Sequence, residues 1–142
     1  MKKEKTVLVC ITPQESSKQL VKSGRAIAEK HGAKLEVVSV LPLCQGDGEY
    51  KIEPDIIEKL YQTARSEKGE MAVYFSDDPI LTVSAHIAKR KPLTLVAGFP
   101  GERSNNFVSA IHLLLPDIPV SMVDTRGVIY NILPYEAMQS VR

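Results

Sequence analysis

Apolar residues follow two alternating patterns along this chain. Short continuous runs of aliphatic and β-branched residues are typical of strands that are buried on both faces of a parallel sheet. Such runs cover residues 6–11, 35–41, 71–75, 93–98 and 119–123. Between them, apolar residues recur at spacings of three and four, which predicts amphipathic helices over about residues 17–31, 55–64, 79–90 and 107–115.

Strands that alternate with single helices predict an α/β domain. Each helix carries the chain in the right-handed sense from one parallel strand to the next, so helices cover both faces of the sheet. The expected fold class is therefore α/β, a doubly wound five-stranded parallel sheet, over residues 1–124. Asp78 followed by Pro79 predicts the start of the third helix, with aspartate as the cap and proline in the first turn.

The fifth strand and the tail after it predict self-association. As an edge strand, residues 119–123 would expose unpaired backbone groups, and the same strand of a second copy could pair with them. The tail, residues 125–142, is expected to pack on the body or on that second copy, because it carries too much apolar surface to leave in water. Its apolar residues include Val128, Ile129, Tyr130, Ile132, Leu133 and Tyr135. The sequence thus predicts a homodimer through the fifth strand and the tail.

Composition narrows the class of protein. The chain has 142 residues, of which 44% are hydrophobic, and this suits one domain with a sizeable core. Lysine and arginine total 18 against 17 aspartate and glutamate residues, so no net charge would hold the chain on nucleic acid or on an anionic membrane. No apolar run approaches the roughly 20 residues that span a bilayer. We therefore expect a cytoplasmic protein.

Metal-binding and catalytic patterns are missing from the sequence. Cys10 and Cys44 lack metal-ligand spacing, and His31, His86 and His112 fall in separate helical segments. Cys10 is interpreted as a small buried hydrophobe, Cys44 as a passive loop thiol, and His86 and His112 as helix-surface residues. No nucleophile lies at a spacing that would serve either histidine. We therefore predict no metal site, no catalytic residue and no enzymatic activity.

Several short sequence segments resemble the universal stress protein family, and together they span about residues 5–124. The segments are residues 7–9 leading to a serine-rich helix start, residues 32–38, Asp78-Pro79, residues 95–101 and Pro119-Val120. The resemblance implies the adenine nucleotide alpha hydrolase-like fold and a regulatory role in stress response, exerted through the ligand or the association state. Residues 9–17 are also similar to the stress-protein module of potassium-sensing histidine kinases, which implies a sensory role through a separate signalling protein partner.

The resemblance also implies an adenine-nucleotide site. Nucleotide-binding members hold adenosine with an aspartate after the first strand and phosphates with a G-x-x-G turn, followed nine residues later by G-[S/T]. Gly98 and Gly101 match the first two glycines, whereas Thr12 replaces the aspartate, and the later glycine turn is missing. ATP or AMP is the expected ligand, bound weakly or not at all. The implied ligand contacts are Ile11, Thr12, Pro13, Val40, Gly98, Gly101, Arg103, Ser104, Asn105 and Asn106.

Simpler interpretations of these residues stay open. Gly98 and Gly101 also suit an ordinary strand-to-helix turn, Thr12 a strand-terminal turn, and Arg103 a solvated surface position. The loop over residues 43–54 is acidic and would repel polyphosphate.

Two other functions compete with the regulatory interpretation. A nucleotide hydrolase or transferase of the adenine nucleotide alpha hydrolase-like group would need a metal carboxylate and a cationic clamp, and only Arg103 offers a cation near the strand ends. A receiver domain of the response-regulator type would need acidic residues after the first strand, and only Asp77 or Asp78 could then be the phosphorylated residue.

Overall fold

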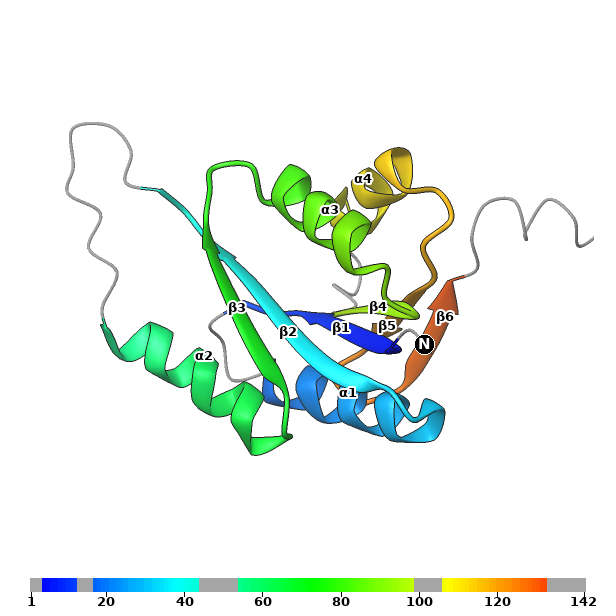
Figure 1. The fold of residues 1–142 in the computed structure, drawn as a ribbon, viewed down its shortest axis with the longest axis horizontal. Coiled ribbons are helices and arrows are strands. Elements are labelled where there is room, and N and C mark those ends of the chain that lie inside the picture. Colours follow the sequence, from blue (N-terminus) through cyan, green and yellow to red (C-terminus); the bar gives the residue numbers. More distant parts are fainter. Residues whose placement is uncertain (1–3, 13–16, 44–53, 99–105, 133–142) are drawn as a thin grey trace, which may run out of the picture.

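The computed structural model describes residues 4–12, 17–43, 54–98 and 106–132. Strands and helices alternate through most of this part of the chain (Figure 1). In chain order the elements are β1 (Thr6–Cys10), α1 (Ser17–His31), β2 (Lys34–Leu41), α2 (Pro54–Ser66), β3 (Glu70–Phe75), α3 (Pro79–Arg90), β4 (Thr94–Gly98), α4 (Asn106–Leu114), β5 (Val120–Val123) and β6 (Ile129–Ile132).

The strands form one sheet in the order β3-β2-β1-β4-β5-β6. The first five pair in parallel, and β6 pairs antiparallel with β5, from Val120 opposite Ile132 to Val123 opposite Ile129. The predicted doubly wound parallel α/β fold is therefore confirmed. The described sheet has six strands where five were predicted, and β5 is not an edge strand, because β6 of the same chain pairs with it.

A tight turn explains why the tail returns to the sheet. The Asp124 carboxylate accepts hydrogen bonds from the backbone amides of Arg126 at 2.8 Å and Val128 at 2.9 Å. Gly127 has a φ of 84°, a left-handed conformation that glycine adopts without a steric cost. This turn reverses the chain and delivers β6 to the free edge of β5.

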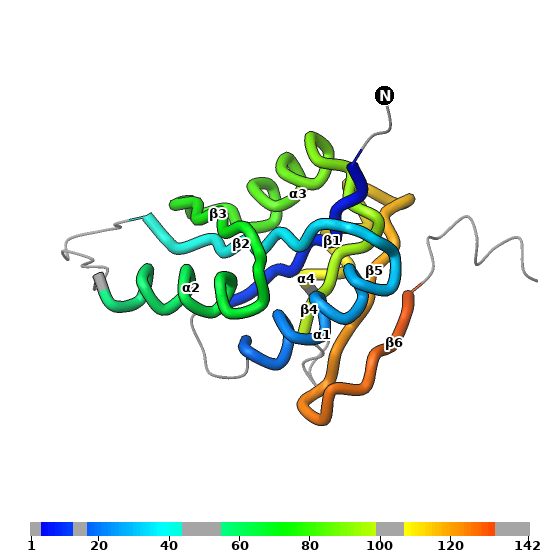
Figure 2. Tube along the Cα trace, turned by 60° about the horizontal axis from the view of Figure 1, so that its bottom comes forward, coloured from blue at the N-terminus to red at the C-terminus, as the bar shows by residue number. Residues whose placement is uncertain are grey.

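Helices cover the two faces of the sheet in pairs, with α1 and α2 on one face and α3 and α4 on the other (Figures 1 and 2). Successive residues of a strand point to opposite faces, so a strand between two helical layers must be apolar at every position. In β1, Val7 and Val9 pack with Val21 of α1, whereas Leu8 packs with Val83 of α3. The continuous apolar runs of the sequence therefore correspond to strands with two buried faces.

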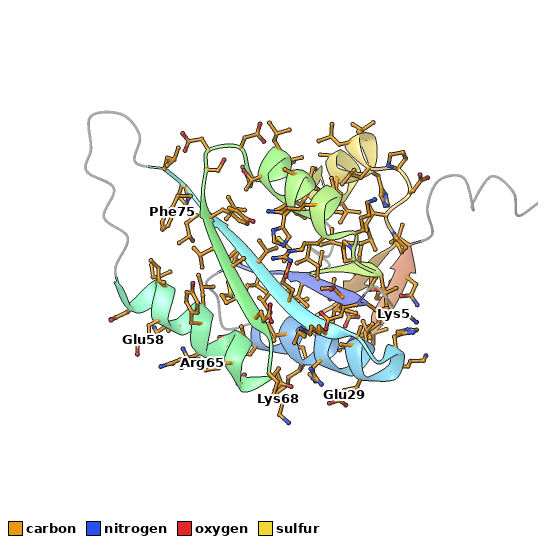
Figure 3. All side chains as sticks on the ribbon, in the orientation of Figure 1. Lys5, Glu29, Glu58, Arg65, Lys68 and Phe75 are labelled. Atoms are coloured by element: carbon orange, nitrogen blue, oxygen red, sulfur yellow. The ribbon has the colours of Figure 1, made fainter. Side chains whose placement is uncertain are left out.

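The charged positions of the helices face water. Glu29 of α1 and both Glu58 and Arg65 of α2 project away from the sheet (Figure 3). The start of α3 is as predicted: the Asp78 carboxylate accepts from the amide of Leu81 at 3.0 Å, and Pro79 is the first helical residue. Within the described residues, no helix is long and apolar enough to cross a membrane.

Candidate functional site

A pocket lies between α1 and α2, beside the carboxyl end of β1. The chain passes from β1 to β2 and β3 on one side, and then to β4 on the other side of β1. Open α/β sheets bind ligands at the carboxyl ends of the strands near such a reversal. The pocket is a cleft of about 610 Å³ on the α1 and α2 side of β1, and no residue of β4 is among its described lining residues. Its described lining is Ile11, Thr12, Ser17, Lys18, Lys22, Ile56, Lys59, Leu60, Gln62, Thr63 and Ser66.

The charge of this pocket is entirely positive in its described part. Three lysines line it, Lys18 and Lys22 from α1 and Lys59 from α2, and no carboxylate is among the described lining residues. Neither Lys22 nor Lys59 forms an ion pair with a described residue. Cations without a paired anion attract an anionic ligand. The pocket therefore suits a phosphate or carboxylate better than a cation or a neutral molecule.

The floor and rim differ in polarity. Ile11 and Leu60 are buried and give the pocket an apolar floor. Thr12 and Thr63 are among the lining residues, and their hydroxyl groups can donate or accept hydrogen bonds. An apolar floor with a few polar groups at its edge is typical of small-molecule sites. The arrangement suits a ligand with a flat apolar part and an anionic part.

The junction of β1 and α1 holds one side of the pocket in place. The hydroxyl of Ser17, which is buried, donates a hydrogen bond to the backbone carbonyl of Thr12. This bond ties the first residue of α1 to the end of β1. The first turn of α1 contributes Ser17 and Lys18 to the lining. The amino end of a helix carries a partial positive charge, which adds to the field of the lysines.

Only part of the site expected from the sequence reaches this pocket. Ile11 and Thr12 line it. Gly98 ends β4 beside α1, where an added Cβ would lie 3.4 Å from Leu20 Cδ1. Val40 packs in the core on the α3 and α4 side, so the structure does not bring it to the pocket.

The remaining expected positions carry no side-chain description. Asn106 begins α4, and only its backbone is described. The other predicted contacts lie outside the described residues: Pro13, Gly101, Arg103, Ser104 and Asn105. Their contribution to a ligand site stays a prediction.

The lysines were missed by the sequence interpretation. Lys18 and Lys22 are four residues apart, so they share one face of α1, and this spacing was a usable signal. Lys59 belongs to a helix that follows a different strand. Its position opposite α1 depends on how two helices pack on the same face of the sheet, which no local pattern specifies.

His86 is also in an unexpected environment. It was interpreted as a helix-surface residue, and this was wrong, because only 5% of it is exposed. Its Nε2 is hydrogen-bonded to Glu36 Oε1, and its Nδ1 lies 2.6 Å from the hydroxyl of Tyr74. Arg90 Nε lies 3.5 Å from the second oxygen of Glu36. A hydrogen-bonded chain of polar side chains thus lies between α3 and the sheet, on the face opposite the lysine pocket.

Cys10 is held as a neutral thiol. Burial raises its pKa to about 12. This agrees with its interpretation as a small hydrophobe, whereas Cys44 lies outside the described residues. Among residues 4–12, 17–43, 54–98 and 106–132, no group of three His, Cys, Asp or Glu side chains is placed to hold a metal ion.

Solved structures share this architecture, although no protein-family model matches the sequence and no curated protein sequence matches it significantly. A universal stress protein in complex with cAMP superposes with a TM-score of 0.64 at 18% identity, covering 87% of this chain and 99% of the other. A universal stress protein from Archaeoglobus fulgidus gives a TM-score of 0.62 at 17% identity, covering 83% and 92%. The chain has the universal stress protein fold.

The resemblance expected from the sequence is therefore confirmed at the level of the fold. A third structure, the universal stress protein from Archaeoglobus fulgidus in complex with dAMP, has a TM-score of 0.56 at 19% identity, over 86% of this chain and 98% of that one. Two of these three structures of the universal stress protein fold thus contain an adenine nucleotide.

Proposed function

We propose that this chain is a regulatory domain of the universal stress protein type that binds an adenine nucleotide between α1 and α2. The observation that carries the proposal is the pocket at the end of β1, whose described lining contains lysines and no carboxylate. Two proteins of the same fold are in complex with cAMP and dAMP, which supports an adenine nucleotide as the ligand. ATP and AMP are the first ligands to test.

The two parts of such a ligand match the two parts of the pocket. The phosphate lies between Lys22 and Lys59, which approach the pocket from different helices. The base packs against Ile11 and Leu60 on the apolar floor. Thr12 offers a hydroxyl to the ribose, a weaker acceptor than a carboxylate. The lysines therefore supply the larger share of the affinity.

A ligand in this position would link binding to signalling. It would bridge α1 and α2, which contact each other on the same face of the sheet (Figure 2). A bridge between two helices favours the arrangement in which both helices contact the ligand. A signalling protein that contacts α1 or α2 would then distinguish the liganded from the free chain.

Calorimetric titration with ATP, AMP and cAMP tests the proposal. Replacing one lysine in Lys22→Gln or Lys59→Gln removes a charge-assisted contact and should weaken binding about tenfold. Lys30→Gln is the matched control, because Lys30 is exposed on the last turn of α1 and does not line the pocket. The proposal fails if no nucleotide gives binding heat, or if all three variants bind like the wild type. Magnesium-dependent release of phosphate from ATP would instead favour a hydrolase.

We also propose that the association state depends on β6. Since β6 covers β5, β6 is the outermost strand on this side of the sheet among the residues that the structure describes, and its Ile129 and Tyr130 are exposed. A second copy pairing along this edge would satisfy the backbone groups of both strands. A lysine placed on an edge strand opposes such pairing.

Sedimentation velocity measures this association directly. Ile129→Lys should shift a wild-type dimer to the monomer, and Leu113→Lys, on the exposed surface of α4, should leave the dimer intact. A monomeric wild type at high protein concentration, or a dimeric Ile129→Lys variant, would rule out pairing along β6.

A further inference from the structure

A chain of hydrogen bonds on the α3 face ends at a partly exposed tyrosine. It runs from Glu36 on β2 through His86 on α3 to Tyr74 on β3. Glu36 and His86 are buried, whereas Tyr74 is 37% exposed. Neither the nucleotide proposal nor the fold alone requires this arrangement of titratable groups. It is separate from the lysine pocket, because α3 covers the opposite face of the sheet from α1 and α2.

The direction of the hydrogen bonds follows from donor and acceptor chemistry. The Glu36 carboxylate accepts hydrogen bonds, so His86 donates to it through Nε2–H. A neutral imidazole then has its acceptor lone pair on Nδ1, and the hydroxyl of Tyr74, 2.6 Å away, donates to it. Arg90 Nε, 3.5 Å from Glu36 Oε2, supports the negative charge of that carboxylate.

The hydroxyl, imidazole and carboxylate are arranged in the same order as in enzymes that activate a hydroxyl nucleophile. Hydroxyl nucleophiles are activated by a base within hydrogen-bond reach, and the base is oriented by a third group. Here Tyr74 is the hydroxyl, His86 is the base, and Glu36 orients the base and fixes its tautomer. Burial of Glu36 and His86 keeps water from competing for these hydrogen bonds.

Tyr74 and His86 line a second pocket of about 390 Å³ between β3 and α3. Leu81 and Ala85 give it apolar walls, and Lys89 adds a positive charge. The charged groups on the elements around His86 are Lys34 and Glu36 of β2, Glu70 of β3, and Lys89 and Arg90 of α3. The pocket has room for a small acyl group, and the Lys89 ammonium would attract an anionic leaving group.

We propose that the Tyr74 hydroxyl is a nucleophilic site for small activated acyl esters. The phenol oxygen forms a bond to the acyl carbonyl carbon while its proton passes to His86 Nδ1. The bond between that carbon and the leaving oxygen breaks, and the leaving group departs with the electron pair. His86 then returns the proton to the leaving group or to water. The products are an acyl ester on Tyr74 and the released alcohol, with no change of oxidation state.

Reaction with p-nitrophenyl acetate tests the site. The released nitrophenolate gives the rate, and peptide mass spectrometry locates the acetyl group. Tyr61 is the internal control, because it is 39% exposed and no hydrogen bond joins it to a described residue. Tyr74 should be acetylated at least about tenfold faster than Tyr61, since general-base assistance contributes that much or more.

Two variants separate activation of Tyr74 from simple exposure. Acetylation of Tyr74 should appear as an initial fast phase of nitrophenolate release. Tyr74→Phe removes only the hydroxyl and should abolish this phase. His86→Gln should slow it by roughly 10²-fold.

The comparison within the wild type stands even if His86→Gln fails to fold. Equal acetylation of Tyr74 and Tyr61, or acetylation confined to lysines, would overturn the proposal. A folded His86→Gln variant that labels Tyr74 at the wild-type rate would overturn it as well. Nucleotide binding is measured separately, so either result leaves the test of the lysine pocket unaffected.

Discussion

Replacing Gly24 with alanine should destabilise this protein, although alanine is the better helix former. Gly24 is buried in α1, where the helix crosses the sheet. A Cβ at this position would lie 2.3 Å from Val9 Cγ2 and 3.2 Å from Leu35 Cδ1. Both neighbours are buried core residues, and Val9 has a stiff β-branched side chain in the middle of β1. The new methyl group must therefore displace α1 from the sheet.

The size of the effect is a balance of two terms. Alanine in place of glycine favours a helix interior by about 1 kcal/mol. Inserting a carbon into a close-packed core costs about 1–3 kcal/mol. The contact with Val9 is well below any normal carbon–carbon separation, so the cost lies toward the upper end. We expect Gly24→Ala to lower the free energy of unfolding by about 1–2 kcal/mol, equivalent to a Tm decrease of about 3–8 °C.

Chemical denaturation of four variants measures both terms. Ala26→Gly, at an exposed position of the same helix, reports the helix-propensity term alone. Val9→Ala makes room for the new methyl, so the Gly24→Ala/Val9→Ala protein should be more stable than the sum of the single changes predicts, by about 1 kcal/mol or more. Additive single changes, or a stabilised Gly24→Ala protein, would show that α1 does not pack this closely on β1.

Three further predictions concern the α3 cap, the partly buried thiol of Cys10 and the β5–β6 turn. Asp78→Ala removes the carboxylate that caps α3 and should cost about 1 kcal/mol of stability in denaturant. Cys10 has a pKa of about 12 in the fold against 9.0 when exposed, so stability should fall as pH rises from about 9 to 12, and Cys10→Ala should flatten that fall. Hydrogen bonds lower the pKa of Asp124, and the largest effect comes from the Val128 amide. The stability that the Asp124 carboxylate contributes is therefore fully present above the pKa of an unfolded aspartate, and it is lost as the pH falls through the lower folded value. NMR titration should therefore place this carboxyl below an aspartate in an unfolded peptide.

Each of these has a matched comparison. Asp117→Ala changes an exposed aspartate outside any helix and should leave stability within error of the wild type. Alkylation of Cys10 in the folded protein should be slow at neutral pH, because its pKa is raised and its side chain packs against the core, and rapid modification of that thiol would contradict this. Asp124→Asn keeps the side-chain acceptor and removes the titration, so an unchanged acid limb of the stability curve would contradict the assigned role of Asp124.

The alternation of strands and helices was predictable because it depends on local sequence periodicity. Val7, Leu8 and Val9 are apolar in succession because each face of β1 meets a different helical layer. Asp78 caps α3 with atoms only three residues away in the chain. These features appear as local patterns of residue types, so they can be predicted from the sequence without knowing which distant segments pack together.

The sixth strand was not predictable in the same way. The tail was expected to bury its apolar residues, but its partner depends on the free edge of β5 and on the turn at Asp124. His86 carried a usable signal, since it lies three residues after Val83 on the inward stripe of α3, and Glu36 is a charge within an otherwise apolar strand. Neither signal alone shows that the two side chains meet.

The sequence by itself determined the order of the elements and the parallel doubly wound sheet. Tertiary structure alone decided that Lys59 of α2 faces the two pocket lysines of α1, that β6 covers β5, and that Glu36, His86 and Tyr74 form one hydrogen-bonded chain. The physical reason is the range of the interactions. Secondary structure follows from residues within one or two turns, whereas pockets and polar chains require side chains from separate elements to meet.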